Sequence, residues 1–265
     1  MTLLSVESVT MRFGGLTALD NVSFDIAAGQ VSAIIGPNGA GKTTLFNLIA
    51  GFQSPLSGRI RLGDRDITGQ APHRIAAQGI VRTFQLVQLF PDLSAQQNVE
   101  AGCHLRGSGG VWAALTRSAR ARRELAEAAA IARELLVFVG LGERADMPAA
   151  ALTYGQQRLL EVARAMAAGP RLLLLDEPAA GLNLQETLHL AGVIRAVIRR
   201  GITVLLIEHD MNLVMRVAQH IVVLDFGRKI AAGSPQAVQN DPAVLEAYLG
   251  GVEAGASAMT EGSHA

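Results

Sequence analysis

One stretch of the chain contains the residue types needed to hold a phosphate chain. Glycines let a backbone turn so that several N–H groups face one anion, and a following helix N-terminus strengthens the attraction. Lys42 could reach the β- and γ-phosphates of a nucleotide, and the Thr43 hydroxyl could bind Mg²⁺. We therefore predict a nucleoside triphosphate site and disfavour a chance glycine-rich turn, because the full pattern G-x-x-x-x-G-K-[ST] is present. Its residues are Gly36, Pro37, Asn38, Gly39, Ala40, Gly41, Lys42 and Thr43, followed by Thr44.

Two adjacent carboxylates follow a run of four leucines. Asp176 and Glu177 come directly after residues 172–175, which are typical of a buried strand. The carboxyl ends of strands in open parallel sheets face the ligand crevice. Asp176 could hold Mg²⁺, directly or through water, while Glu177 could orient or deprotonate the attacking water. The alternative is a solvated strand end with ordinary acids, which the phosphate-binding pattern makes less favoured.

The surrounding pattern predicts the elements that would position these groups. Short strands are expected at 3–11, 22–26 and 31–35, the last leading through the glycine-rich loop into a helix at 44–50. From about residue 85 to 155 strand patterns disappear, a loose loop is expected at 107–110, and a long helix at 119–139. Helices at 157–167, 184–200 and 211–218 then alternate with strands at 172–176, 203–207 and 221–224. The alternation indicates a mostly parallel sheet covered by helices, with an inserted helical lobe.

Composition narrows the class of protein. The 265 residues are 49% apolar and 17% charged with zero formal net charge, so a sizeable core is possible and no basic excess points to nucleic acid. The single cysteine, Cys103, excludes an internal disulfide and fits a reducing compartment. No apolar run approaches the roughly 20 residues of a membrane-spanning helix. We expect a soluble chain that reaches a membrane only through a partner.

A further motif resembles the signature of the ATP-binding cassette family, usually Leu-Ser-Gly-Gly-Gln. The segment runs Leu152-Thr153-Tyr154-Gly155-Gln156 and lies just before the acidic strand, as in that family. The hydroxyl of Thr153, the backbone of Gly155 and the helix start at Gln156 could bind the γ-phosphate of ATP held by a second subunit. Thr153-x-x-Gln156 is also a capping box, which merely starts a helix. Both interpretations can hold together.

Three other positions match functional residues of the same family. Gln85 matches the glutamine loop, which would contact Mg²⁺ or the attacking water and link the core to the helical lobe. His209 matches the switch histidine that contacts the γ-phosphate, and Phe13 matches the aromatic residue that stacks on adenine. Taken alone, they are typical of polar surface, a surface histidine and a core phenylalanine. Asn183 replaces a usual aspartate and Tyr154 a usual glycine, which leaves open how this subunit couples to its neighbour and whether the two ATP sites are equivalent.

The resemblance covers roughly residues 3–250 and implies the fold. It implies an α/β protein with a P-loop NTPase (RecA-like) core, an N-terminal antiparallel β portion and an inserted α-helical subdomain. The core is expected at 1–85 and 156–235, the helical subdomain at about 86–155, and a C-terminal helical extension at 236–250. These form a single ABC ATPase domain over 1–250, and the Gly-, Ala- and Ser-rich tail at 251–265 is expected to be disordered.

Within the family, the chain is most similar to the ATPases of branched-chain amino acid importers, some relatives of which import urea or short amides. That likeness implies ATP and Mg²⁺ as ligands, a second identical or paralogous ATPase in a head-to-tail dimer, permease subunits in the membrane and, indirectly, a periplasmic solute-binding protein. It places the chain at the cytoplasmic side of the inner (plasma) membrane as a peripheral subunit. The segments that carry it are Arg12–Gly15, Gly79–Gln85, Tyr154–Arg158, Ala180–Asn183, Asp241-Pro242 and Ala247–Gly250.

Two other functions use the same phosphate-binding pattern. ABC-type ATPases that act on nucleic acid usually carry a long coiled-coil insert or zinc-binding cysteines, whereas this lobe is short and the chain has one cysteine. A small-molecule kinase would need neither the signature nor the histidine at 209. We therefore expect a transporter ATPase, although no residue specifies the transported solute. An ABC-type ATPase of another transporter class, such as an exporter, shares the same core and stays open as an alternative.

Overall fold

The computed structural model describes residues 1–106 and 119–248, and these divide into two compact units. Unit 1 comprises residues 1–72 together with the described part of 205–265, and unit 2 comprises the described part of 73–204. The loop expected at 107–110 and the tail expected at 251–265 lie outside the described residues. Within the described ranges, no helix combines the length and the apolar character that a membrane crossing requires.

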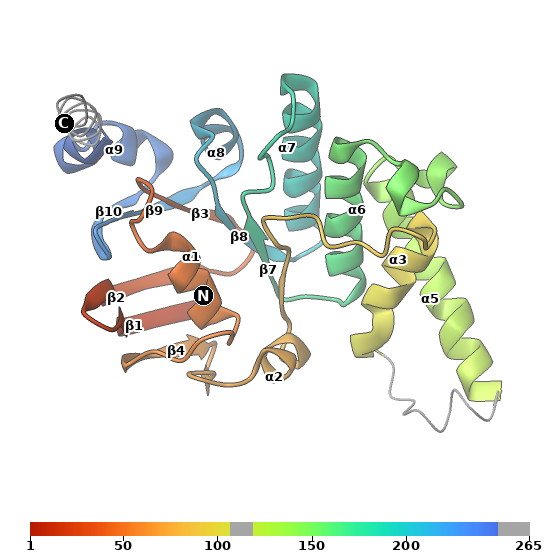
Figure 1. Cartoon of the computed structure of the whole chain (residues 1–265), viewed down its shortest axis with the longest axis horizontal. Coiled ribbons are helices and arrows are strands. Elements are labelled where there is room, and N and C mark those ends of the chain that lie inside the picture. Colours follow the sequence, from red (N-terminus) through yellow and green to blue (C-terminus); the bar gives the residue numbers. More distant parts are fainter. Residues whose placement is uncertain (107–118, 249–265) are drawn as a thin grey trace, which may run out of the picture. The chain divides into compact units, whose positions relative to one another are not determined.

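Unit 1 begins with an antiparallel sheet. Its strands are β1 (Thr2–Phe13), β2 (Leu16–Ala27), β4 (Ser57–Leu62) and the short β5 (Arg65–Asp66), in the order β2-β1-β4-β5 (Figure 1). Strand β1 pairs antiparallel with both β2 and β4. Alternate residues of β1 and β2, such as Leu4 and Val6 opposite Ile26 and Phe24, are buried, as expected when one face of a sheet packs on a core. This sheet is the predicted N-terminal antiparallel portion.

The second part of unit 1 carries the parallel strand pair. Strand β3 (Val31–Ile35) is buried throughout and runs parallel to β9 (His220–Asp225), which continues through a hairpin into the antiparallel β10 (Arg228–Gly233). The helices are α1 (Lys42–Ile49), α8 (Met211–Val217) and α9 (Pro235–Gln239), and α9 packs against β9 and β10. A last helical stretch covers residues 242–248. Strand β8 (Thr203–Ile207), also buried throughout, contains the point in the chain where unit 2 gives way to unit 1.

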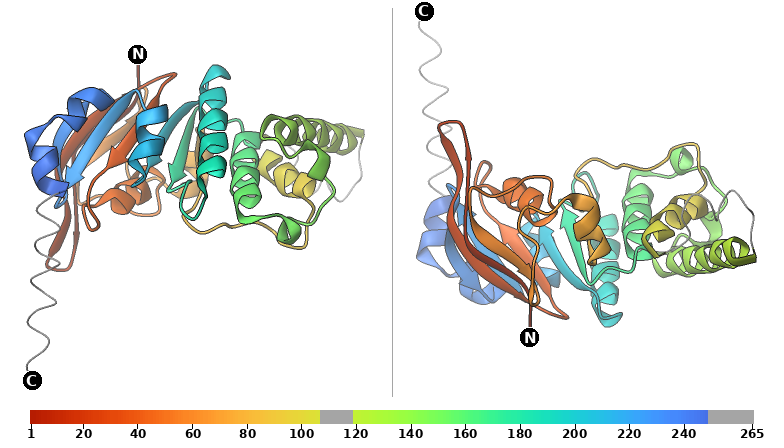
Figure 2. Two further views of the ribbon diagram at one scale, coloured as in Figure 1. Left: turned by 90° about the horizontal axis from the view of Figure 1, so that it is seen from above. Right: turned by 90° about the horizontal axis from the view of Figure 1, so that it is seen from below.

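Unit 2 combines a parallel strand pair with a helical cluster. Strand β6 (Ile80–Arg82) follows α2 (Pro72–Ala77) and runs parallel to β7 (Leu172–Asp176), which leads to α7 (Leu184–Arg199). Helices α3 (Ala95–Gly102), α5 (Ala119–Phe138) and α6 (Tyr154–Ala167) pack on one another (Figure 2). Gly102 permits the tight contact between α3 and α6, because a Cβ there would overlap the carbonyl oxygen of Arg164. Short 3₁₀ turns lie at Cys103–Arg106, Gly142–Arg144 and Ala149–Ala151.

The predicted elements are largely present. The strands expected at 31–35, 172–176 and 203–207 have those bounds, and α5, α7 and α8 end within one residue of the predicted limits. Helix α6 begins at Tyr154 rather than at 157, because Thr153 and Gln156 form a reciprocal capping box that starts the helix earlier. Strands β4, β6 and β10 were not predicted. They are short or polar on exposed faces, so their pairing depends on neighbours distant in sequence.

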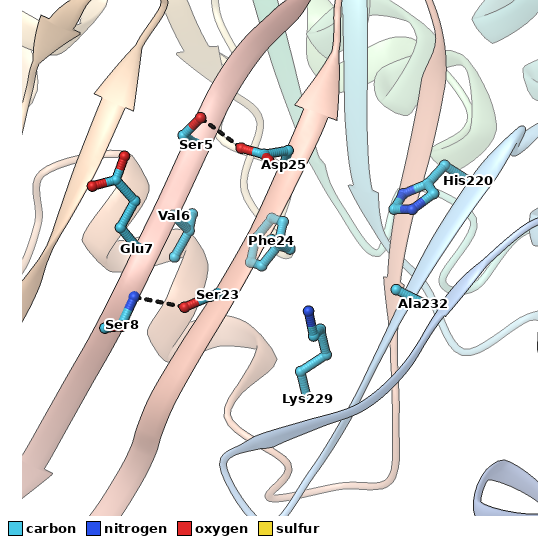
Figure 3. Close-up of a pocket in the computed structure, with 10 residues that line it drawn as sticks. All are labelled: Ser5, Val6, Glu7, Ser8, Ser23, Phe24, Asp25, His220, Lys229 and Ala232. Atoms are coloured by element: carbon cyan, nitrogen blue, oxygen red, sulfur yellow. Dashed lines mark hydrogen bonds between the residues drawn. The ribbon is translucent and has the colours of Figure 1, made fainter.

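A groove of about 600 Å³ lies in unit 1 between β1–β2 and β9–β10 (Figure 3). Ser5 Oγ donates a hydrogen bond to Asp25 Oδ1 at 2.6 Å on one wall of this groove. On the other wall, His220 Nδ1 is buried and has no hydrogen-bond partner among the described residues. Burial lowers the pKa of His220, and the nearby positive charge of Lys229 lowers it further. The folded chain therefore favours the neutral imidazole.

This histidine should give the chain a specific acid sensitivity. Because its pKa is lower in the folded than in the unfolded chain, the folded state binds fewer protons, so the free energy of unfolding should fall as pH drops below about 6.5. In His220→Gln that contribution should disappear. Urea denaturation at pH 7.5 and pH 5.5 would measure it. His73→Gln, an exposed change on α2, is the matched control and should keep the wild-type pH dependence. An unchanged pH dependence in His220→Gln would contradict the assignment.

Candidate functional site

The phosphate-binding loop joins β3 to α1 in unit 1, as predicted. Gly36 has φ 150° and Gly41 has φ 97°, conformations that residues with a Cβ rarely adopt. Space excludes a side chain as well. A Cβ at Gly36 would overlap the carbonyl oxygen of Leu224, and a Cβ at Gly41 would lie 2.6 Å from the carbonyl oxygen of Ala18. Glycine is therefore required at both ends of the loop by its immediate surroundings.

The loop and the start of α1 have the features expected of the predicted anion site. The N-cap residue Gly41 provides no side-chain hydrogen bond, and the first turn of α1 contains no acidic residue. The positive end of the helix is thus not neutralised by its own sequence. Lys42 is buried, and its Nζ donates to the carbonyl oxygens of Gly36 at 2.7 Å and Pro37 at 2.8 Å. Thr43 is exposed and Thr44 half-buried, so both hydroxyls lie at the helix start where a phosphate or its metal would bind.

The β9–β10 turn and strand β2 of unit 1 support the phosphate-binding loop through hydrogen bonds. The Gly227 N–H, in the β9–β10 turn, donates to the Ala40 carbonyl at 3.2 Å, and the Asp20 N–H donates to the Gly227 carbonyl at 2.8 Å. Arg228 then binds the Asp20 carboxylate through Nε at 2.9 Å and Nη2 at 2.7 Å. The sequence analysis missed these contacts, since no local pattern links β2 to a turn about 200 residues away.

Tyr248 also contacts the phosphate-binding loop. Burial raises the pKa of Tyr248, and a hydrogen bond with the backbone of Gly36 acts in the opposite direction. The sequence analysis noted Ala247–Gly250 only as a family likeness and gave Tyr248 no role. The structure thus shows that Tyr248, which is distant in sequence, is a neighbour of the phosphate-binding loop.

Two predicted nucleotide contacts lie in the same unit. Phe13 ends β1, pairs with Leu16 across the hairpin and is 45% exposed, so it is not a core phenylalanine. His209 follows β8, and its side chain is 62% exposed. The backbone around it is fixed by Glu208, which is fully buried and whose Oε2 accepts the N–H groups of His209 at 3.1 Å and Asp210 at 3.3 Å. Sequence reasoning overlooked Glu208 because an acid beside a histidine is ordinarily a surface residue.

The acidic pair and the glutamine loop meet in unit 2. Asp176 ends β7 with its side chain 4% exposed, and its Oδ2 lies 2.6 Å from Nη2 of Arg82 at the end of β6. Glu177 has φ 45°, a strained conformation for a residue with a side chain, of the kind that collects at functional sites. Gln85 Nε2 donates to Glu177 Oε2 at 3.0 Å. The structure therefore brings together the predicted Gln85, Asp176 and Glu177, and adds Arg82, which the sequence analysis had not singled out.

The signature segment also lies in unit 2, at the start of α6. Thr153 Oγ1 accepts the Gln156 N–H at 3.4 Å, and Gln156 Oε1 accepts the Thr153 N–H at 3.1 Å, so the capping interpretation is confirmed. Gly155 is buried, and a Cβ there would overlap the carboxylate of Glu186. The binding of a facing subunit's γ-phosphate by Thr153, Gly155 and Gln156 stays a prediction.

Asn183, the departure from aspartate, also caps a helix. Its Oδ1 accepts the Glu186 N–H at 3.0 Å, and Glu186 Oε2 accepts the Asn183 N–H at 3.0 Å, forming a capping box at the start of α7. An amide oxygen caps a helix as well as a carboxylate does. The replacement therefore removes a charge without removing the local hydrogen bonds.

The predicted site residues fall into two groups. Unit 1 holds Phe13, the loop from Gly36 to Thr44, and His209, while unit 2 holds Gln85, the signature residues and the acidic pair. The chemistry of the first group fits the phosphates of a nucleotide, and that of the second fits a metal ion and an attacking water. Their action on a single nucleotide stays a prediction.

Comparison with known proteins identifies the class to which this fold and these motifs belong. Residues 19–180 match the ABC transporter family, so the chain belongs to that family and is an ATP-binding cassette ATPase with the P-loop NTPase fold. Residues 228–254 match the family described as branched-chain amino acid ATP-binding cassette transporter. The predicted family and fold class are thus confirmed.

Individual relatives agree with this assignment over almost the whole chain. The chain is 46% identical over 249 residues to the high-affinity branched-chain amino acid transport ATP-binding protein BraF of Pseudomonas aeruginosa, covering 94% of this chain and 98% of that protein. It is 43% identical to LivG of Escherichia coli K12, which carries the same description, with the same coverage. Among solved structures, a nucleotide-free ATP-binding cassette from an ABC transporter matches with a TM-score of 0.82 and 33% identity, over 94% of this chain and 99% of that one.

The crowding at Gly36 should make this position intolerant of any side chain. We expect Gly36→Ala to lower the free energy of unfolding by about 2 kcal/mol or more, because the added methyl group meets backbone rather than a movable side chain. Gly192→Ala in α7 is the matched control, since a Cβ there meets nothing within 4 Å, and it should stabilise the chain by about 0.5–1 kcal/mol. Urea denaturation would measure both. Equal stability of the two variants would refute this account of the loop.

Proposed function

We propose that the chain is the ATP-hydrolysing subunit of an importer for branched-chain amino acids or a related small polar solute. The proposal rests mainly on the similarity of nearly the whole chain to BraF and LivG. The phosphate-binding loop, in which Lys42 is held over the backbone of Gly36, supports it. The match of residues 228–254 favours this function over an ABC-type ATPase that acts on nucleic acid. We place the chain at the cytoplasmic side of the inner membrane, as a peripheral subunit.

Nucleotide binding would be the task of unit 1. The phosphates would replace the carbonyl oxygens of Gly36 and Pro37 as partners of the Lys42 ammonium, while the N–H groups at the start of α1 hold the same oxygens. Phe13, which is half exposed, would stack on the adenine ring. Since the lysine is already held over the loop, little side-chain entropy would be lost on binding.

Hydrolysis would require residues of unit 2 together with Thr43 and His209 of unit 1. Thr43 and Asp176 would hold Mg²⁺, with Gln85 as a further contact, and the ion would neutralise charge on the phosphates. Glu177 would accept a proton from water as the water oxygen bonds to the γ-phosphorus and the bond to the leaving ADP oxygen breaks. Gln85 donates to Glu177 Oε2 at 3.0 Å, and the carboxylate has further acceptor positions for the attacking water. His209 would contact the γ-phosphate.

We propose a dimer, because the signature residues of one chain would complete the ATP site of the other. Thr153, Gly155 and Gln156 would bind the γ-phosphate held by a second, identical or paralogous ATPase arranged head to tail. A related ATP-binding cassette, MJ0796, is known as a dimer bound to ADP and Pi, with a TM-score of 0.74 and 25% identity over 88% of this chain. ATP-driven closure would move permease subunits in the membrane, which receive solute from a periplasmic binding protein.

The role of Glu177 can be tested by removing its charge alone. Glu177→Gln keeps the size and hydrogen-bonding capacity of the side chain but cannot accept the proton, so we expect about a 100-fold or larger fall in kcat with ATP binding retained. Release of inorganic phosphate and equilibrium binding of ATP would measure the two effects. Glu143→Gln, an exposed change in the same unit, should leave both unchanged. Full turnover by Glu177→Gln would exclude Glu177 as the base.

The role of Lys42 can be tested through affinity. Lys42→Ala removes the ammonium group from the loop, so the Kd for ATP should rise about tenfold or more, corresponding to about 1.4 kcal/mol. Isothermal titration calorimetry would measure it. Lys229→Ala on β10 is the matched control, because it removes the same charge from an exposed position outside the loop. If both variants bind ATP as the wild type does, Lys42 is not a phosphate contact.

A further inference from the structure

Tyr154, a departure from the usual family pattern, lies against Gly181 in unit 2. Tyr154 is the first residue of α6, where the signature usually has glycine, and Gly181 lies in the Ala180–Asn183 loop before α7. Gly181 has φ 78°, and a Cβ on it would lie 3.0 Å from Cε1 of the Tyr154 ring. A side chain at residue 181 would therefore crowd the ring, which would have to shift by a few tenths of an ångström to admit it. The two positions are complementary in shape.

The ring also contacts a cation. The guanidinium carbon of Arg158, one turn along α6, lies 5.2 Å from the centroid of the Tyr154 ring, within the range of a cation–π interaction. Tyr154 is 43% exposed, whereas the Arg158 side chain is only 3% exposed. Tyr154 therefore touches the Ala180–Asn183 loop on one side and a buried charge on the other.

Arg158 holds the backbone of the glutamine loop. Its Nη1 donates to the Phe84 carbonyl at 2.9 Å, and its Nη2 donates to the Gln85 carbonyl. Its charge is balanced by Glu161, which is 2% exposed and lies 3.4 Å away. Glu161 Oε1 in turn accepts the Gln88 N–H at 2.8 Å. Two buried charges of α6 therefore fix the loop on both sides of residue 86.

The glutamine loop also contacts Glu177, the proposed base. Gln85, whose carbonyl is held by Arg158, donates through its side chain to Glu177 at 3.0 Å. A continuous series of contacts thus runs from the Ala180–Asn183 loop through Tyr154 and Arg158 to Gln85 and Glu177. All of these contacts lie within unit 2.

We propose that Tyr154 is a positioning residue that ties the Ala180–Asn183 loop to Arg158 and thereby sets the place of Gln85 beside Glu177. The inference rests on the proposed ATPase function and adds to it a residue that does not touch the nucleotide chemistry itself. Glycine at this position suffices for the usual signature, so the ring is not needed to bind phosphate. Its contribution lies in joining two loops that flank the base.

The kinetic test compares three residues at position 154. In Tyr154→Gly the ring is lost, so the glutamine loop is held less firmly, and we expect kcat for ATP hydrolysis to fall about five- to tenfold while KM for ATP changes less than twofold. Tyr154→Phe retains the ring and should keep the wild-type kcat within twofold. Leu125→Ala, which truncates a side chain that is 69% exposed on α5, is the surface control. Wild-type kcat in Tyr154→Gly, or an equal loss in Tyr154→Phe, would overturn the proposal.

A double-mutant cycle tests whether Tyr154 and Gly181 act through their contact. The methyl group of Gly181→Ala would press on the Tyr154 ring, so its effect on kcat should be several-fold smaller in the Tyr154→Gly background than in the wild type. Equal fold-changes in both backgrounds would show that the two residues act independently and would refute the coupling.

Hydrogen exchange of the nucleotide-free chain separates this inference from the ATPase proposal. In Tyr154→Gly, we expect the amides of residues 85–88 and 180–182 to exchange at least threefold faster than in the wild type, with Tyr154→Phe unchanged. The measurement needs no turnover, so it tests Tyr154 even if the purified wild-type chain fails to hydrolyse ATP, a result that would count against the proposed function alone. Unchanged exchange in both segments would overturn the role of Tyr154.

Discussion

The close approach of backbone to backbone around the phosphate-binding loop is the constraint on which the site depends. Gly36 and Gly41 leave no room for a Cβ against Leu224 and Ala18, so only glycine lets the chain follow this bend. The buried strand β3 fixes one end of the bend and helix α1 the other. Lys42 then supplies the charge from within the same turn. The proposed anion site would therefore be formed largely by main chain, with a shape that neighbouring segments determine.

Much of this arrangement could be predicted from local sequence. Strands β3, β7 and β8 are short apolar runs that any parallel sheet must bury, and the loop residues form a contiguous pattern whose spacing is set by phosphate geometry. The capping of α6 was also open to prediction, because Thr153 and Gln156 are three residues apart. Features determined within about ten residues of sequence were thus accessible.

The residues that the sequence analysis missed share a different property. Arg82 forms an ion pair with Asp176, which lies 94 positions away in the sequence. Tyr248 forms a hydrogen bond with the backbone of Gly36. Glu208 can be recognised as a structural residue only from the folded chain, where it is fully buried and accepts hydrogen bonds from two backbone N–H groups. The contacts of Arg82 and Tyr248 have no local pattern, since each depends on which distant segments become neighbours, and the burial of Glu208 depends on packing in the same way. The same reason explains why β4, β6 and β10 were not predicted.

The contact of Gly102 with Arg164 has a mechanical consequence for the helical cluster. Because Gly102 at the end of α3 meets the main chain of Arg164 in α6 without an intervening side chain, the two helices are closely packed at this point. This close contact gives a displacement of α6 a direct route to α3.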